Sequence, residues 1–316
     1  MNRNLGIIVD PMKKIVLTLS LLCLTSLGYS QEYRASGLAF LQVNPDSRLS
    51  ALGGSGVGLG EQSGQMGPGI YLMNPAIYAE DPGTIVQAGH SIWYAEAGIE
   101  FLGIAFPAYG WNWSTSITSV NLTGFELRDN RALDEPLGEF GAHYLRAGVH
   151  GSRALTPKIS AGARIDYLYE KIYYDMASGG SVSLGVQYEY SDQLRFGATL
   201  NHLGGMGKLH NESTPLPTSL QVGMGISRDI PEINIDYNMF VDAAAYLDDL
   251  LAFSGGYEFV YQRFFAVRGG LQYVNDAVIP SFGAGIRWHN LIFDYGLVLP
   301  RHQLGTPHQF SVHLLL

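Results

Sequence analysis

From about residue 83 to the end of the chain, apolar and polar residues alternate with a period of two. The stretch LQVGMGIS at 220–227 is one example, with Val222 and Met224 on one face and Gln221 on the other. Because successive side chains of a β-strand point to opposite faces of its sheet, this alternation predicts strands. After residue 30, no stretch approaches the roughly 18 uninterrupted apolar residues that a membrane-spanning helix needs.

The alternation predicts fourteen strands. They cover residues 83–93, 98–107, 110–122, 140–153, 157–171, 179–190, 193–203, 217–228, 232–242, 250–260, 263–275, 280–289, 290–299 and 306–316. We expect the short connections at Ser191–Asp192 and Tyr261–Gln262 to be periplasmic turns, and the longer ones at 123–139 and 204–216 to be outer loops.

The two faces of these strands differ in composition. Gly, Ser, Asn, Gln, Asp and Arg dominate the polar face, whereas the apolar face ends in aromatic residues. A polar lumen, an apolar outer band and aromatic girdles are typical of a transmembrane barrel. A soluble β-sandwich or propeller also alternates, but its strands usually have about 5–6 residues and its outer face bears charges. We therefore predict an all-β fold, a 14-stranded antiparallel transmembrane β-barrel over residues 83–316.

Composition and charge agree with a barrel in an apolar medium. Charged residues make up 15% of the chain, well below the roughly 25% of soluble domains. The formal net charge of -9 argues against nucleic acid as a partner. The single Cys rules out a disulfide framework within the chain and any Cys-based zinc or iron–sulfur site. No cofactor is predicted.

The first 30 residues have the pattern of a secretory signal peptide. Lys13 and Lys14 precede the apolar run 15–24, and the small residues Gly28 and Ser30 fit the positions before a cleavage site. We expect translation to start at Met12 and cleavage to occur before Gln31. The apolar run is too short for a membrane span, which needs about 20 residues.

The segment 31–82 is rich in glycine and lacks sustained alternation. It contains no G-x-G-x-x-G motif between a strand and a helix, so a phosphate-binding loop is not supported. Asn74 and Pro75 predict the start of a short helix over Pro75–Glu80, with Asn as the N-cap. Irregular backbone is tolerated at membrane depth when it is buried inside protein. We therefore predict that 31–82 is a plug folded into the lumen.

Three motifs in this segment resemble a known family. They are FLQVNPDSR at 40–48, ALGG at 51–54 and NPA at 74–76, and the closing stretch LGTPHQFS at 304–311 fits as well. The motifs resemble the PorV/PorQ family, outer-membrane proteins of the type IX secretion system in Bacteroidetes. That family is similar to the FadL-like long-chain fatty-acid transporters, which are 14-stranded barrels with an N-terminal plug and a similar Asn-Pro-Ala.

The resemblance implies a non-enzymatic role in the outer membrane of a Gram-negative bacterium of the Bacteroidetes. It implies outer-membrane lipid, type IX translocon or surface-attachment subunits and secreted cargo as partners. The alternative is a FadL-like channel for hydrophobic small molecules, which would need a continuous apolar pocket. An enzyme is the weakest hypothesis, because the chain has no G-x-S-x-G motif.

The candidate functional site consists of two sets of residues, one in the plug segment and one on the inward face of the strands. The plug and motif residues are Pro45, Asp46, Arg48, Gly53, Gly54, Asn74 and Pro75, and the lumen charges are Arg164, Asp166, Asp236, Arg268, Arg287 and Asp294. We expect Asp46 to pair with one of the lumen arginines and Arg48 with one of the lumen aspartates, because a buried charge must be paired. The alternative is that both are solvated at the periplasmic mouth, where an ion pair contributes about 0–1 kcal/mol. No metal site is expected, since no two His are spaced as H-x-x-x-H.

Overall fold

The structure is a computed structural model that describes residues 37–60, 67–80, 82–94, 97–128, 135–248, 250–300 and 305–316. The signal peptide predicted over 1–30 lies outside the described residues. Residues 31–36, 61–66 and 81 of the predicted plug segment also lie outside them.

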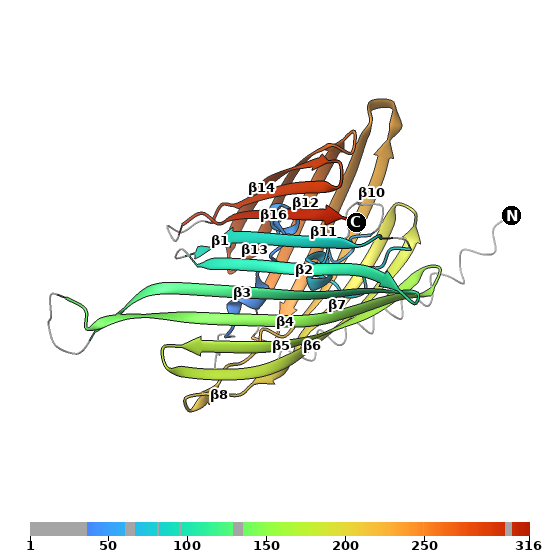
Figure 1. Cartoon of the computed structure of the whole chain (residues 1–316). Helices are drawn as coiled ribbons and strands as arrows, with labels where there is room; N and C mark the ends of the chain where they lie inside the picture. Colours follow the sequence, from blue (N-terminus) through green and yellow to red (C-terminus); the bar gives the residue numbers. More distant parts are fainter. Residues whose placement is uncertain are drawn as a thin grey trace. The chain divides into compact units, whose positions relative to one another are not determined.

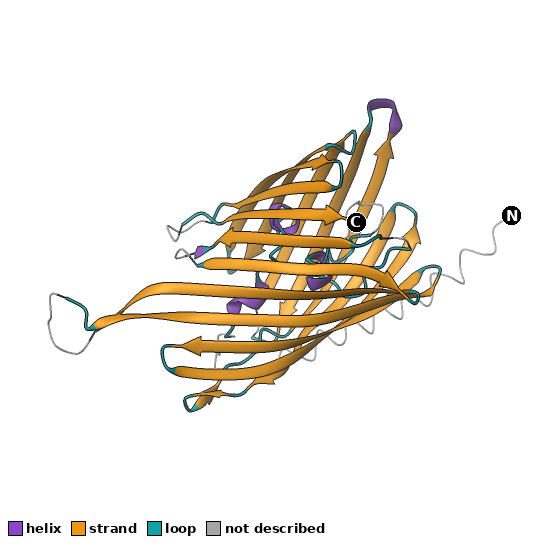
Figure 2. Ribbon diagram, viewed as in Figure 1, coloured by secondary structure: helices purple, strands orange, loops and turns teal. Residues whose placement is uncertain are grey.

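Most of the described chain is β-strand (Figures 1 and 2). The strands are β1 (Ile85–Ile92), β2 (Gly98–Ala108), β3 (Trp111–Leu127), β4 (Gly138–Thr156), β5 (Ile159–Ile172), β6 (Asp175–Ser191), β7 (Leu194–Met206), β8 (Lys208–Leu209), β9 (Glu212–Ser213), β10 (Ser219–Ile230), β11 (Ile235–Tyr246), β12 (Leu251–Tyr261), β13 (Phe265–Val274), β14 (Ala277–Trp288), β15 (Leu291–Val298) and β16 (His308–Leu315). The helices are η1 (Ala39–Gln42), α2 (Ser47–Ala51), η3 (Ile70–Leu72) and η5 (Pro231–Ile233). None of these helices is long and apolar enough to cross a membrane.

Fourteen of the strands form a closed antiparallel barrel, as predicted. Each strand pairs with its neighbours in sequence, and β1 pairs with β16 to close the sheet. The two remaining strands, β8 and β9, form a small hairpin between β7 and β10. Closure satisfies every strand edge, which is the condition for a sheet in an apolar medium.

Strands β3 and β4 extend into the first of the two predicted outer loops from both sides, and residues 128–137 connect them. The β3–β4 pairing continues to Leu127 and Gly138, beyond the predicted ends at 122 and 140. A bulge between Leu122 and Phe125 shifts the register there, and the rings of Phe125 and Phe140 then pack with centroids 5.4 Å apart. A bulge interrupts the period-two pattern, so the pattern alone ended the strand too early.

The two ends of the barrel differ in their connections. One end has the turns at 109–110, 157–158, 192–193, 231–234, 262–264 and 289–290, together with the start of β1 and the end of β16, and we call it the short-turn end. At the opposite end, which we call the long-loop end, successive barrel strands are separated in sequence by residues 93–97, 128–137, 173–174, 207–218, 247–250, 275–276 and 299–307, of which 95–96, 129–134, 249 and 301–304 lie outside the described residues. Both predicted turns, Ser191–Asp192 and Tyr261–Gln262, fall at the short-turn end.

The alternation sorts the side chains as predicted. Apolar side chains such as Val222 and Met224 point outward and are 48% and 37% exposed. The polar side chains that alternate with them along the barrel strands point inward, and many are fully buried, among them Ser183 of β6 and Gln309 of β16. An exposed apolar wall around a buried polar interior is typical of a barrel whose outer face meets lipid.

The residues 37–60 and 67–80, which we call the inner segment, lie against the inward faces of the strands. Helix α2 contacts β13, β14, β15 and β16. The inner segment also forms an apolar core of its own, built from Leu49, Leu52, Val57, Leu59, Ile70, Tyr71, Met73, Ile77 and Ala79 with Ala105 of β2 and Phe240 of β11. A second apolar cluster at the long-loop end joins Leu38 and Leu41 to Leu168, Ala177, Met206 and Leu216.

Glycines on the inward faces let the inner segment approach the wall closely. A Cβ atom at Gly270 of β13 would lie 2.1 Å from the Gly53 backbone nitrogen, which is too close for any real contact. Gly53 itself has a φ of +70°, a conformation that side-chain-bearing residues rarely adopt. The abundance of glycine on the polar face therefore reflects backbone packed on backbone.

Candidate functional site

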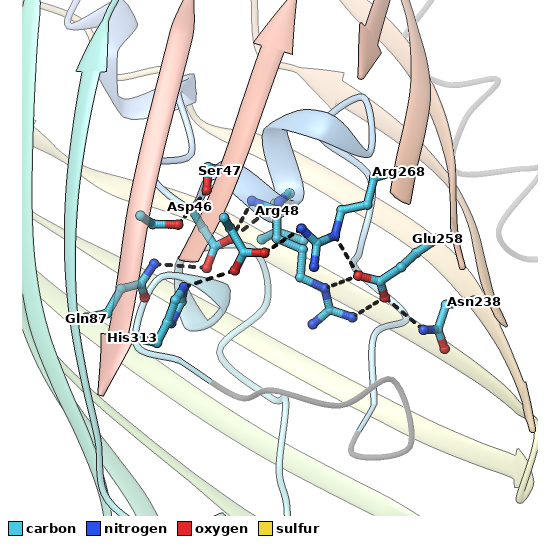
Figure 3. A network of polar contacts seen from close by, with 11 residues as sticks. Asp46, Ser47, Arg48, Gln87, Asn238, Glu258, Arg268 and His313 are labelled. Atoms are coloured by element: carbon cyan, nitrogen blue, oxygen red, sulfur yellow. Dashed lines mark hydrogen bonds and ion pairs between the residues drawn. The ribbon is translucent and has the colours of Figure 1, made fainter. Parts of the chain in front are cut away.

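Arg48 of the inner segment lies in a buried network of four charges (Figure 3). Its Nη2 and Nε atoms donate to the Glu258 carboxylate of β12 at 2.7 and 3.0 Å. Arg268 of β13 donates to the same carboxylate at 2.6 Å and also pairs with Asp294 of β15. Two arginines and two carboxylates balance to zero net charge, which is the condition for burying such a group.

Asp46 has a different part in the same region. Its Oδ1 accepts from the backbone nitrogens of Arg48 at 2.9 Å and Leu49 at 3.3 Å, so that Asp46 is the N-cap of α2. Its Oδ2 accepts from the Gln87 side chain of β1 at 3.0 Å. Helix α2 is absent from the sequence predictions, although Asp46 followed by Ser47 was a signal that could have revealed it.

The expected partners of Asp46 and Arg48 are therefore wrong in detail. Asp46 binds Gln87 and backbone nitrogens, and none of the three lumen arginines expected for it. Arg48 pairs with Glu258, which the sequence did not single out, and not with one of the three lumen aspartates. The other predicted motif residues lie close by: the Pro45 carbonyl oxygen faces Gly89 of β1, and Gly54, like Gly53, has a positive φ, of +73°.

Asn74 and Pro75 form a turn and not the predicted helix over Pro75–Glu80. The Asn74 side chain accepts from the Ala76 nitrogen at 2.9 Å and donates to the Val57 carbonyl at 2.8 Å. The Pro75 carbonyl accepts from His150 of β4 at 2.8 Å. The carbonyls of Ala76, Ile77 and Ala79 accept from Ser160, Ser152 and Asn112 of the wall. Because these wall side chains bind the carbonyls, no helical hydrogen bonds are needed.

Asp242 of β11 also binds the inner segment, and it is not among the residues predicted from the sequence. Its Oδ2 accepts from the backbone nitrogens of Gly56 at 2.6 Å and Val57 at 3.0 Å, so one buried carboxylate holds the glycine-rich stretch. The alternation of apolar and polar residues in β11 already places Asp242 on the inward face. The sequence does not show that Asp242 binds the backbone of Gly56 and Val57.

The predicted lumen charges divide into two groups. Arg268 and Asp294 belong to the Arg48 network, and Arg164 pairs with Asp166 at 2.8 Å while its Nη1 donates to the Tyr71 carbonyl. The other two predicted lumen charges, Asp236 and Arg287, lie at the short-turn end instead. Asp236 is partly exposed and 3.6 Å from the exposed Arg263, and Arg287 is exposed. Their side chains fall on the inward face of the alternation, but each residue lies only one position from the end of its strand.

A cavity of about 160 Å³ lies between the inner segment and the barrel wall. It lies toward the long-loop end, since Trp93, Tyr94 and Tyr246 flank it. Its lining is mixed. The apolar side includes Leu41, Val43, Met73, Ala244, Ala252 and Ile279, and the polar side includes Arg146, Asn201, His202, Gln221, Asp242 and Gln272. Partial burial raises the pKa of the Tyr94 phenol above its ordinary value, so Tyr94 is neutral near pH 7.

Metal chemistry has no support in the described part of the chain. There, no three His, Cys, Asp or Glu side chains come together in a way that could hold a metal ion. The arrangement of the site is that of a small pocket over an anchored segment.

Comparison with known proteins reveals similarity at the level of the fold. No protein-family model matches the chain, and no curated protein matches it either. The Pseudomonas putida toluene transporter TodX is 13% identical, with 84% of this chain and 95% of that chain covered at a TM-score of 0.61. The CymD monoaromatic hydrocarbon channel is also 13% identical, with 89% and 99% covered at a TM-score of 0.64. A FadL homologue from Pseudomonas aeruginosa is 9% identical, with 85% and 97% covered at a TM-score of 0.55.

These comparisons support the broader part of the expected resemblance, the barrel fold, and not the narrower family assignment. The PorV/PorQ and type IX assignment finds no support in them, since no family model matches. The broader expectation, a barrel like those of Gram-negative outer-membrane proteins, is confirmed for the fold. The chain therefore has the 14-stranded fold that it shares with the FadL-like outer-membrane barrels.

Proposed function

We propose that the protein is a non-enzymatic outer-membrane channel for small molecules with a hydrophobic body. The supporting observation is the pocket of about 160 Å³ beside the inner segment. A cavity of about 150 Å³ lined by apolar side chains binds benzene in another protein, so the pocket has room for one aromatic ring or an aliphatic body of that size. The names of the similar structures, a toluene transporter and a monoaromatic hydrocarbon channel, agree with such a ligand.

In this proposal the long-loop end faces the outside of the cell and the short-turn end faces the periplasm, because short periplasmic turns are typical of such barrels. The outward apolar side chains contact outer-membrane lipid. The inner segment is a plug that forms the floor of the pocket, and the Arg48 network and Asp242 fix it to the wall. Passage beyond the pocket requires the plug to move or a side path to open.

The test is uptake in a Gram-negative host that lacks its own FadL-like barrel. We would measure the initial uptake of radiolabelled benzyl alcohol and radiolabelled benzoate, with and without the protein. The Ala244→Trp variant places an indole in the pocket and should abolish most of the uptake. Ala243 is its neighbour on the outward face of β11, so Ala243→Trp is the matched control and should behave as wild type. Uptake no greater than in cells without the protein, for both compounds, would refute the channel.

A docking role, as in type IX secretion, is the second candidate, and one observation favours it. Four aromatic residues cluster beyond the pocket at the long-loop end: Phe125, Phe140, Tyr173 and Tyr174, with successive ring centroids 5.4, 5.6 and 3.9 Å apart. Tyr174 is 75% exposed. Exposed aromatic clusters are common in protein interfaces. Co-purification of secretion subunits from solubilised membranes, lost on Tyr174→Ser, would favour docking over transport.

A further inference from the structure

Arg146 of β4 differs from the other buried arginines of the lumen. It is 2% exposed and lines the pocket. Its Nη2 donates to the Thr118 hydroxyl at 3.0 Å, whereas its Nε has no hydrogen-bond partner among the residues that the structure describes. Arg48, Arg164 and Arg268 each pair with a carboxylate, but Arg146 has no ion pair within the described residues. A buried guanidinium without a counter-charge is costly, so its presence in a pocket points to an anionic ligand.

The surroundings of Arg146 do not supply the missing charge. Arg164 and Asp166 lie near enough for their charges to act on Arg146. Asp166 is already paired with Arg164 at 2.8 Å, so these three side chains have a net charge of +1. The part of the wall around Arg146 is therefore electropositive, although the whole chain is acidic with a formal net charge of -9 and Asp242 lies elsewhere in the pocket lining.

A second polar group is turned toward the same pocket by an irregularity of the barrel. His202 of β7 has a φ of 58°, close to the register shift between Val182 and Leu184 in the β6–β7 pairing. Both Asn201 and His202 are consequently buried, although neighbouring strand residues normally face opposite ways. The His202 Nδ1 atom has no partner in the described structure and is available for one hydrogen bond.

We propose that the pocket binds a small organic monocarboxylate, with the carboxylate at Arg146 and the hydrophobic body against Leu41, Val43 and Met73. The proposal rests on the channel function above and names its substrate class. The limit to one negative charge comes from Asp242, which lines the same pocket. A second anionic group on the ligand would meet that carboxylate. The size of the cavity limits the body to about one ring.

The experiment compares benzoate with benzyl alcohol, two ring compounds of similar size that differ in charge. Binding to the detergent-solubilised full-length protein is measured by isothermal titration calorimetry. We expect benzoate to bind about tenfold more tightly than benzyl alcohol, or better, a factor that corresponds to about 1.4 kcal/mol. This comparison uses the wild-type protein and needs no variant.

The variants assign the preference to Arg146. Arg146→Gln should remove the tenfold preference and leave benzyl alcohol binding unchanged, which also demonstrates an intact pocket. Arg146→Lys should keep part of the preference because it keeps the charge. The matched control is Arg153→Gln on the same strand, where Arg153 is exposed and lies over the Trp111 ring; it should bind both compounds as wild type does.

The outcomes separate the two proposals. Equal binding of benzoate and benzyl alcohol to the wild-type protein would overturn the monocarboxylate proposal and leave the channel in place. A benzoate preference that persists in Arg146→Gln would overturn the assignment of the site to Arg146. Binding of neither compound, together with no uptake of either in cells, would overturn the channel as well.

Discussion

Replacing Arg48 with Met removes one positive charge from the buried network that joins the inner segment to the barrel wall. Met keeps most of the side-chain volume, so packing changes little. Glu258 then loses hydrogen bonds of 2.7 and 3.0 Å but keeps those from Arg268 at 2.6 Å and Asn238 at 2.8 Å. The remaining network has one positive and two negative charges, so a buried net charge of -1 is left.

The size of the effect follows from that count. Removing one partner of a buried ion pair typically costs about 3–5 kcal/mol. Because Glu258 keeps a second arginine, we expect the lower end, about 3 kcal/mol. The loss falls on attachment of the inner segment and not on the strand pairing, since Arg48 has no part in the barrel sheet.

The assay is protease cleavage within the inner segment of the folded barrel in lipid vesicles. A cost of about 3 kcal/mol raises the population of the opened segment, and with it the cleavage rate, by roughly a hundredfold. The barrel should still migrate as a folded species in unboiled gel samples. Glu258→Gln added to Arg48→Met should recover part of the loss, because the uncompensated charge is then gone.

Arg263→Met is the control, since Arg263 is exposed and lies 3.6 Å from Asp236 at the short-turn end. Such a pair is worth about 0–1 kcal/mol, so cleavage should stay near the wild-type rate. If Arg48→Met were cleaved no faster than the control, the network would not hold the inner segment in place, and the anchoring role of Arg48 would be wrong.

Two further predictions concern the barrel wall. Met224→Arg, on the exposed apolar face, should lower the free energy of unfolding in lipid by about 2–4 kcal/mol if it lies near the midplane, whereas Gln221→Arg on the inward face should cost much less; equal losses would contradict the assignment of faces. Gly270→Ala forces a Cβ against the Gly53 backbone and should cost about 1–3 kcal/mol and speed cleavage of the inner segment, whereas Gly205→Ala, which meets nothing within 4 Å, should leave the cleavage rate unchanged.

The sequence alone determined the number of barrel strands and the direction of their side chains. Alternation is a local property, because each side chain's face depends only on its position along its own strand. Val222 and Gln221 could therefore be assigned to opposite faces without any knowledge of neighbouring strands. The failure near Leu122 has the same origin, since a bulge breaks the local period while pairing goes on.

The glycine-rich segment was predicted to enter the lumen from its composition, and its Asp46 and Arg48 are indeed buried. Their partners could not be predicted. Glu258 is 210 residues away in sequence from Arg48, and many other inward residues have the same parity. Which of them meets Arg48 depends on the stagger of the closed barrel and on the path of the inner segment through it.

Depth along the barrel was likewise decided only by the tertiary structure. Arg268 and Arg287 both have inward parity, yet Arg268 is buried in the Arg48 network and Arg287 is exposed beside a turn. Arg146 gave no signal in the sequence, because its importance comes from a missing counter-charge in a pocket formed by several strands and the inner segment. Alternation gives each residue a face, whereas its depth and its neighbours arise when the strands close and the inner segment packs inside them.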